Sequence, residues 1–490
     1  MSIRATVFSL VLAALASCSS SDAASTPTAP SGPPAGTVTA DGSIVVGHTR
    51  QLRGAWIATV SNSSWPSAPG LSEDDAKTEL TGILDKLAAA HFNTIFFQIR
   101  TESDALYASQ LEPWSRYLTG TQGGDPGWDP LTFAIAEGHR RGLEVHAWMN
   151  PYRALVTASA KAATNHVTKT LADAVVRYGT AAWMDPGSPE VRQHILDVIS
   201  DVVGRYDVDG VHFDDYFYPY PVAGQTFDDD ATFAANGNGQ DRDDWRRSNV
   251  DTLIQATNEL VGRLKPSVRF GVSPFGIYRP GMPEGITGLD AYAEIYCDPK
   301  KWIQEGWVDY LAPQLYWTTK STKQDFGKLA AWWAALATNG REVFIGHDVT
   351  KAGTGDWTLD EYDAQLTDVA ANKMNGSIYF SAAALVEDQA GLRAHLADKW
   401  YPSNVATPPL ATAAKTAGDP PKVAGTAVTP LASTRSIAVY ARSGATVTLA
   451  QLLPVSSVDP VTLTLAPGSY AVSLIDRSGA ESRGAPVELP

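Results

Sequence analysis

The sequence predicts an α/β protein, built as a closed (β/α)₈ TIM barrel and followed by a small C-terminal β-sandwich-like module. From residue 51 onwards, short β-rich apolar runs alternate with longer amphipathic segments, and eight such pairs can be counted. Several of the short runs are almost continuously apolar, as expected for parallel strands buried on both faces. No glycine-rich dinucleotide loop follows the first run, which disfavours an open doubly wound sheet.

Eight segments are predicted to be barrel strands: Arg53–Val60, Thr94–Arg100, Leu143–Asn150, Gly210–Tyr216, Arg269–Phe275, Tyr310–Trp317, Val343–Val349 and Ser377–Ala382. The segments between them have helical spacing, because apolar residues recur at i, i+3, i+4 and i+7, as in Leu80, Ile83, Leu84 and Leu87. Each apolar stripe needs a sheet to cover. The alternation therefore accounts for both layers of a barrel.

The chain is predicted to divide into consecutive parts with different compositions. Residues 1–17 combine a basic residue with an apolar run too short to span a bilayer, which indicates a signal peptide. Residues 18–50 are rich in small and polar residues and are expected to form a flexible tether. The barrel is expected over 51–402, a proline-rich linker with little to pack over 403–422, and a small β-rich domain over 423–490.

The end of the predicted signal peptide, Leu15-Ala16-Ser17-Cys18, resembles the bacterial lipobox. In a lipobox, cleavage before the cysteine leaves a thiol that carries diacylglycerol, so Cys18 is expected to be the site of lipidation. The chain has only two cysteines, so no intramolecular disulfide is predicted, and Cys297 is expected to be a small buried residue. The predicted location is extracytoplasmic, periplasmic or at the cell surface, with the membrane contacted through the lipid anchor.

The charge of the chain narrows the choice of partner. The formal net charge is −15 and the sequence pI is about 5.0, so nucleic acid would be repelled. A neutral substrate, or one with locally held charge, fits better. We expect no cofactor.

Polar residues cluster at the predicted carboxyl ends of the strands, where barrel enzymes build their active sites. In strand four a period of two places His212, Asp214 and Tyr216 on one face, and Asp215 on the other. A polar face inside a barrel is costly unless it is used, so we expect it to point inward. Asp214 is therefore the first catalytic candidate, with Asp215 beside it.

Glycoside cleavage usually needs a second carboxyl group, and the sequence leaves its identity open. Glu102, after strand two, and Asp348, at the end of strand seven, are equally good candidates for the acid or for a substrate ligand. Aromatic rings suit the apolar faces of sugars, and polar groups could hold hydroxyls, an N-acetyl group or a lactyl carboxylate. The predicted substrate-binding residues are Arg100, Trp148, Asn150, Tyr152, Arg153, His212, Tyr216, Gln314, Tyr316, Trp317 and His347, with Trp56 as a further stacking candidate.

The order of these motifs resembles the bacterial glycosyl hydrolase-like 10 family over almost all of residues 51–402. The motifs that carry the resemblance are Arg53–Trp56, Gln98–Tyr107, Ala147–Arg153, Asp185–Gly187, His212–Pro219, Val272–Gly276 and Ala312–Trp317. The resemblance implies a barrel glycosidase of bacterial envelopes, with cell-wall glycan strands as the leading substrate. Gly210–Asp214 is also similar to the fourth-strand motif of the α-amylase family, and this resemblance implies that Asp214 is the nucleophile or base. Strand five, however, has only Ser273 and Phe275 at the place of the α-amylase acid.

Two other functions stay open. A metal-dependent carbohydrate deacetylase would need clustered histidines with a carboxylate; His146, His212 and His347 lie at strand ends, but without a paired histidine motif. A non-catalytic glycan-binding lipoprotein could also use a barrel scaffold, since fold does not decide function. The several acidic strand ends favour the enzyme.

Overall fold

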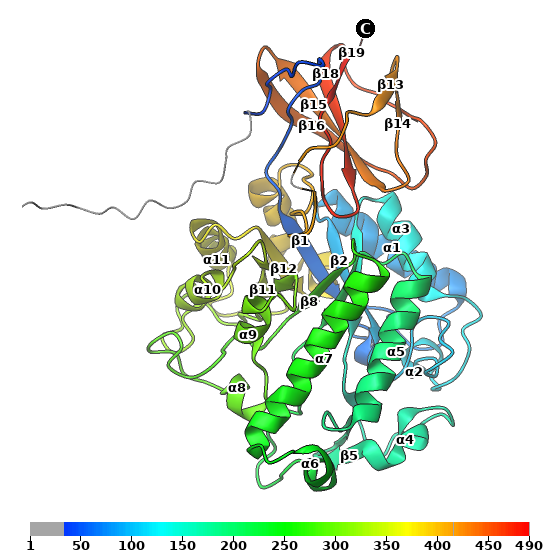
Figure 1. Cartoon of the computed structure of the whole chain (residues 1–490), viewed down its shortest axis with the longest axis vertical. Coiled ribbons are helices and arrows are strands. Elements are labelled where there is room, and N and C mark those ends of the chain that lie inside the picture. Colours follow the sequence, from blue (N-terminus) through cyan, green and yellow to red (C-terminus); the bar gives the residue numbers. More distant parts are fainter. Residues whose placement is uncertain (1–33, 415, 490) are drawn as a thin grey trace, which may run out of the picture.

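The computed structural model describes residues 34–414 and 416–489, and all eight predicted barrel strands are present in it (Figure 1). They form one parallel sheet in the order β10-β9-β8-β7-β3-β2-β1-β12-β11. β10 (Glu342–Val343) and β11 (Ile345–Asp348) are two halves of strand seven; the first pairs with β9 and the second with β12. Because strand seven bridges the two ends of the sheet, the predicted closed barrel is confirmed.

The remaining barrel strands are close to their predicted positions, but most end earlier. Their bounds are β1 (Leu52–Ile57), β2 (Thr94–Arg100), β3 (Glu144–Met149), β7 (Gly210–Phe213), β8 (Arg269–Val272), β9 (Tyr310–Leu311) and β12 (Gly376–Phe380). The difference matters most in strand four, which leaves the sheet after Phe213 and not after Tyr216. The residues that follow no longer alternate between the two faces of the sheet.

Amphipathic helices cover the outside of the barrel. The main ones are α1 (Glu73–Ala89), α3 (Pro130–Arg140), α5 (Pro189–Arg205), α7 (Arg242–Leu264), α9 (Pro299–Gln304), α10 (Phe326–Ala334) and α11 (Leu359–Ala371). The predicted stripe of α1 is buried against the sheet. After β12 the chain continues as α12 (Ala382–Val386), α13 (Leu392–His395) and a π-helical turn (Leu396–Trp400).

Shorter elements fill the loops that follow the strands. They are α2 (Arg116–Thr119), α4 (Val167–Thr170), α6 (Asp230–Asn236), α8 (Ala291–Glu294) and a small antiparallel sheet of β4 (Arg153–Leu155), β6 (Ala181–Met184) and β5 (Val175–Tyr178). In Figure 1, α4, α6 and β5 lie at the end of the barrel away from the C-terminal strands. None of the described helices is both long and apolar enough to cross a membrane.

The predicted C-terminal β domain is present as two antiparallel sheets. One sheet has the order β16-β15-β18-β19 and the other the order β13-β14-β17. Ile437, Val439 and Val472 are fully buried in the separate core of this domain. The strand bounds are β13 (Lys422–Ala424), β14 (Ala427–Thr429), β15 (Thr434–Ser443), β16 (Thr446–Pro454), β17 (Val461–Thr462), β18 (Gly468–Asp476) and β19 (Ala485–Leu489).

Two segments that were predicted to be loose pack against the folded parts. In the tether, Ile44 is only 1% exposed and exchanges backbone hydrogen bonds with Gly484 of the C-terminal β domain. In the linker, Leu410 is buried, and the Thr407 hydroxyl donates to Glu144 at the start of β3 (2.6 Å). The predictions of a free tether up to residue 50 and of a linker with little to pack are therefore wrong, because their apolar residues have distant partners. Cys18 lies outside the described residues, while Cys297 is buried.

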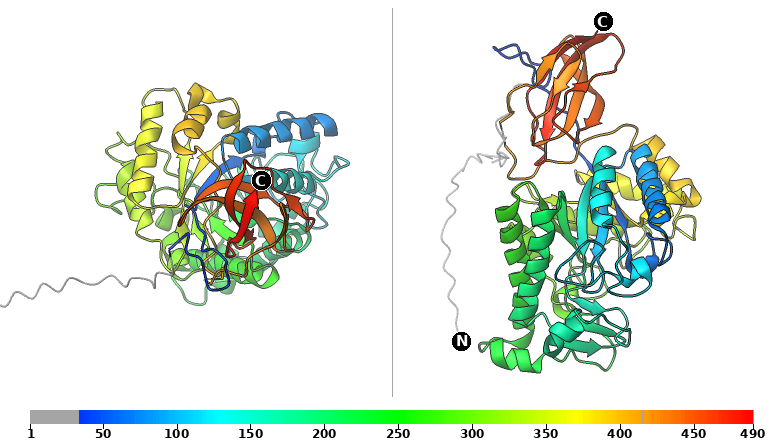
Figure 2. Two further views of the ribbon diagram at one scale, coloured as in Figure 1. Left: turned by 90° about the horizontal axis from the view of Figure 1, so that it is seen from above. Right: turned by 90° about the vertical axis from the view of Figure 1, so that its right-hand side faces the viewer.

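The C-terminal β domain packs against the amino ends of the barrel strands (Figure 2). Arg435 of β15 pairs with Asp209, directly before β7, and Arg477 pairs with Asp207. Asp209 also accepts hydrogen bonds from His139 Nε2 (2.8 Å) and from the backbone N–H of Val145 (2.8 Å). The carboxyl ends of the strands are thus left free at the opposite end of the barrel.

Candidate active site

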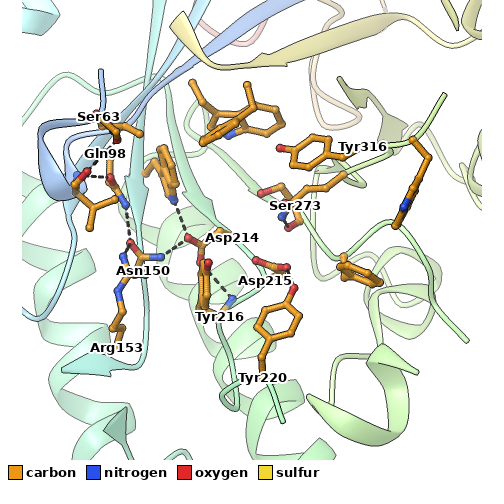
Figure 3. A pocket seen from close by; sticks show the side chains of 18 residues that line it. Ser63, Gln98, Asn150, Arg153, Asp214, Asp215, Tyr216, Tyr220, Ser273 and Tyr316 are labelled. Carbon is orange, nitrogen blue, oxygen red and sulfur yellow. Dashed lines mark hydrogen bonds between the residues drawn. The ribbon is translucent and has the colours of Figure 1, made fainter. Parts of the chain in front are cut away.

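A cavity of about 330 Å³ lies at the carboxyl ends of the barrel strands (Figure 3). Because strand ends and the loops behind them meet there, residues far apart in the sequence share its wall. The predicted site residues that line it are Trp56, Trp148, Asn150, Arg153, Asp214, Asp215, Tyr216, Gln314, Tyr316 and Trp317. Most of the predicted site is therefore brought together in one place.

Asp214 lies in the middle of the view in Figure 3 and is only 4% exposed. Its Oδ2 accepts hydrogen bonds from Trp148 Nε1 (3.1 Å) and from Asn150 Nδ2, and its Oδ1 faces the backbone N–H of Tyr216 (3.3 Å). Burial, together with the neighbouring charge of Asp215, raises the pKa of Asp214 to about 7. This carboxyl group can therefore hold a proton near neutral pH.

The orientation of the Asn150 side chain is set by its other contacts. Its Oδ1 accepts hydrogen bonds from Gln98 Nε2 (2.7 Å) and from Arg153 Nη2 (2.8 Å), so its NH₂ group faces Asp214. Gln98 is held in turn by the backbone N–H of Thr59, which donates to its Oε1 (2.9 Å). Hydrogen bonds through the side-chain amides of Gln98 and Asn150 thus position the Asp214 carboxylate.

Asp215 also lines the cavity, which corrects its predicted place on the opposite face of strand four. The period of two does not apply to it, because β7 has already ended at Phe213. Burial raises the pKa of Asp215, while the hydrogen bond from the Tyr220 hydroxyl acts against this rise. Asp214 and Asp215 thus form a pair of buried carboxyl groups.

Aromatic rings form much of the rest of the wall. Tyr316 stacks on Phe380, with ring centroids 6.1 Å apart and 29° between the planes. Trp317 meets Phe275 edge to face at 5.7 Å. The Arg153 guanidinium lies 5.0 Å from the centre of the Tyr216 ring. Such walls present apolar surface with a few polar groups, which suits a sugar ring.

Glu102 and Asp348 do not line this cavity, and each fastens a loop. Glu102 is fully buried, pairs with Arg116 (2.5 Å) and accepts from the backbone N–H of Val156 (2.8 Å). Asp348 pairs with Lys351 (2.8 Å). Burial raises the pKa of Glu102 to about 7, but its contacts lie away from the aspartate pair. The structure therefore brings neither of these two carboxylates into the cavity with Asp214.

Four predicted substrate-binding residues are also outside the cavity wall. Arg100 is buried in an ion pair with Glu112 (2.6 Å) and donates to backbone oxygens behind β3. Tyr152 is fully buried in the core. His347 points to α11, where its Nδ1 meets Gln365 (2.8 Å). These three residues therefore lie outside the cavity wall, because polar residues at strand ends also serve packing and loop attachment.

His212, the fourth, lies inside the barrel beneath the cavity. Its Nε2 accepts from Trp56 Nε1 (3.1 Å), and its Nδ1 meets the Tyr310 hydroxyl (3.0 Å). Burial lowers the pKa of His212, which keeps the imidazole neutral. His212 thus supports Trp56 in the wall and does not itself reach the cavity.

Several cavity-lining residues were not among the predicted site residues: Ala58, Val60, Ser63, Gln98, Tyr220, Ser273, Phe275 and Phe380. Gln98 had a usable signal, because it is a polar residue at the end of strand two. Tyr220 had none, since it follows Asp215 within an irregular loop.

The three histidines that a metal-dependent deacetylase would need do not lie together in one site. His146 and His212 both contact Tyr310 inside the barrel, whereas His347 faces α11. Within residues 34–414 and 416–489, no three His, Cys, Asp or Glu side chains are placed to hold a metal ion.

Acid–base cleavage of a glycosidic bond uses two carboxyl groups. This barrel places Asp214 and Asp215 beside an aromatic wall in one cavity. Fold and site together define a glycoside hydrolase. The glycosyl hydrolase-like 10 model matches residues 51–358, and the chain belongs to this family.

Two relatives of the chain, YngK and DigH, are named glycosyl hydrolases. The chain is 39% identical over 389 residues to glycosyl hydrolase YngK of Bacillus subtilis (strain 168), covering 76% of each protein. It is 35% identical over 403 residues to glycosyl hydrolase DigH of Escherichia coli (strain K12), covering 75% of this chain and 89% of DigH. The solved PgaB (BpsB) glycoside hydrolase domain from Bordetella bronchiseptica aligns with a TM-score of 0.49 and 11% identity, over 72% of this chain and 98% of that domain.

Proposed function

We propose that this glycosidase cleaves glycan strands of peptidoglycan or a related polysaccharide of the bacterial envelope, with Asp214 and Asp215 as its catalytic pair. The observation that carries the proposal is the placement of both buried carboxyl groups in one aromatic cavity. The loss of Glu102 and Asp348 as candidates leaves Asp215 as the second carboxyl group.

The surroundings of Asp214 and Asp215 indicate which of the two carboxyl groups is the acid. Two neighbouring buried carboxyl groups resist ionising together, so one keeps a proton. The Tyr220 hydroxyl donates to Asp215 and favours its charged form, and that charge raises the pKa of Asp214. We therefore assign Asp214 as the general acid, which reverses the nucleophile or base role expected from the sequence.

The reaction then proceeds in a simple order. The protonated Asp214 donates its proton to the glycosidic oxygen as the bond from that oxygen to the anomeric carbon breaks. The Asp215 carboxylate stabilises the positive charge that develops at the anomeric carbon. Water completes the hydrolysis, with the deprotonated Asp214 accepting its proton.

The envelope substrate is supported by the predicted export signal and by the cavity wall. Arg153 is a cation in this wall, near both aspartates, and could meet the lactyl carboxylate of a cell-wall sugar. We further propose that the protein is anchored outside the cytoplasm through a lipid on Cys18. Residues 36–46 lie on the C-terminal β domain, at the end opposite the cavity, so an anchored chain would present the cavity away from the membrane.

The test is digestion of purified, peptide-free glycan strands with mass analysis of the products. Wild-type protein should release shorter strands with new reducing ends, and Asp214→Asn should release almost none. Strands of unchanged length that have lost acetyl groups would favour the deacetylase. Strands that are bound but chemically unchanged would favour the glycan-binding lipoprotein.

A further inference from the structure

A second cavity, open and about 460 Å³ in volume, adjoins the active-site cavity. The two cavities share Tyr316 and Trp317 as a common wall. The far side of the second cavity is formed by the loop after β11, with Lys351, Asp356 and Trp357. A ligand in the first cavity therefore lies against residues that also face the second.

The second cavity has two half-buried tryptophans, Trp317 and Trp357. Trp357 packs against Tyr362, with ring centroids 6.0 Å apart, and this contact helps to hold the Trp357 ring in place. Exposed apolar ring surface that is held rigidly can bind a partner at little cost in side-chain entropy.

The charges around this cavity cancel in pairs. Lys351 pairs with Asp348 (2.8 Å), and Lys320 pairs with Asp356 (2.7 Å). The Lys351 ammonium lies 5.1 Å from the centre of the Trp357 ring and is half exposed, so it has donors left for a ligand. Aromatic surface with a hydrogen-bond donor and balanced charge fits a hydroxylated ring better than a strongly charged ligand.

We propose that the second cavity is an accessory subsite for a neighbouring sugar unit of the same glycan chain. A pyranose ring packs there against Trp317 and Trp357, and Lys351 donates to its oxygen atoms. The inference rests on the proposed function, since the active-site cavity must hold the sugar at the cleaved bond. It makes the enzyme selective for chains over single terminal sugars, because binding away from the reacting bond contributes to kcat/KM.

The chain offers a matched control for Trp357. Trp307 is also half buried, has Lys301 at 5.2 Å from its ring centre, and that lysine pairs with Asp251 (2.7 Å). Trp307 precedes β9, however, and so lies at the amino end of the barrel. It repeats the local chemistry of Trp357 far from both cavities.

The experiment measures kcat/KM on peptide-free glycan oligosaccharides of increasing length. For wild type and Trp307→Ala, kcat/KM should rise with chain length until both cavities are filled. Trp357→Ala should lower the ratio of kcat/KM on the longest to that on the shortest substrate by about tenfold, and Lys351→Ala should lower it in the same direction. A ratio equal to that of wild type in both variants would overturn the subsite.

Two further measurements distinguish a failure of the proposed subsite from a failure of the proposed function. If wild-type protein cleaves no member of the series, the proposed function fails. Calorimetric titration of Asp214→Asn with the longest oligosaccharide then tests the subsite alone: adding Trp357→Ala should weaken binding about tenfold, and equal affinities would contradict the inference. If Trp357→Ala does not fold, Lys351→Ala decides, because its side chain is half exposed.

Discussion

Asn150 donates from its Nδ2 to Asp214, across the boundary between β3 and β7. The amide cannot turn over without losing both hydrogen bonds that Gln98 and Arg153 make to its Oδ1. The protein itself thus holds the NH₂ group of Asn150 towards Asp214, without any contact from a ligand. Preorganised groups of this kind account for much of the power of enzyme active sites.

Asp214→Asn and Asp215→Asn are both expected to reduce kcat on glycan strands by about a thousandfold, or about 4 kcal/mol in activation free energy. Each change removes one carboxyl group of the pair while keeping the size of the side chain. Steady-state kinetics on the shortest cleaved substrate measures the effect. Asp348→Asn is the control and should stay within about tenfold of wild type, because Asp348 lies outside the cavity. Near-normal turnover in both pair variants would show that the catalytic residues lie elsewhere.

The pH dependence of kcat/KM should report the general acid. Asp214 must be protonated to act, so activity should fall as the pH rises through about 7. Trp148 Nε1 donates to the charged form and lowers the pKa, so Trp148→Phe should move this alkaline limb upward by about one pH unit. An alkaline limb that stays in place or moves downward would contradict the assignment of Asp214 as the acid.

Asp214 is also expected to make the folded protein less stable at high pH. Its pKa is raised from 3.8 to about 7, so its stabilising contribution is complete below 3.8 and is lost as the pH rises through 7. Asp214→Asn carries no charge at any pH. At pH 8 its free energy of unfolding should exceed that of wild type by about 1–4 kcal/mol, and the difference should shrink towards pH 4. Urea unfolding at the two pH values measures this, and a difference independent of pH would count against it.

Cys18→Ala is expected to release the protein from the membrane fraction, because the predicted anchor is a lipid on this thiol. Ser17→Ala, which keeps the cysteine, is the control and should leave the protein in that fraction. Cell fractionation with detection of the full chain decides. Equal membrane association of the two variants would rule out the anchor.

The barrel and the position of Asp214 at its carboxyl end could be predicted from the sequence for a physical reason. Strands buried on both faces read as apolar runs, and a polar residue inside such a run stands out. Asp215 was misplaced because alternation holds only within a strand, and β7 ends at Phe213. That Glu102 lies outside the cavity could not be predicted, because a carboxylate that fastens a loop has the same local sequence pattern as one that faces a cavity.

The packing of the amino-terminal segment could not be predicted at all. Ile44 pairs with Gly484, near the other end of the chain, and such long-range pairing leaves no local pattern. The proline-rich stretch after the barrel looked like a linker by composition, although Arg269 donates to the Pro408 carbonyl oxygen. Composition reports the flexibility of an isolated segment and not the surface that it meets.

Arg435→Ala is expected to destabilise the whole protein, because Arg435 of the C-terminal β domain pairs with Asp209 at the amino end of the barrel strands. The Asp209 side chain is only 6% exposed, and the nearby Arg435 and His139 hold its pKa well below the ordinary value despite burial. Removing the arginine leaves His139 and the Val145 N–H as the remaining donors. The free energy of unfolding should fall by about 2–4 kcal/mol, since a buried charge loses its main partner.

Arg483→Ala is the matched control within the same domain. Arg483 pairs with two aspartates, Asp41 and Asp419, but these are 51% and 95% exposed, so the loss should stay below about 1 kcal/mol. Neither change should alter kcat of the folded enzyme, because the cavity lies at the other end of the barrel. Denaturant unfolding at pH 7 compares the two variants. Equal stabilities would mean that the C-terminal β domain contributes little through Arg435, whereas a loss of kcat in folded Arg435→Ala would mean that this domain influences the active site through the barrel.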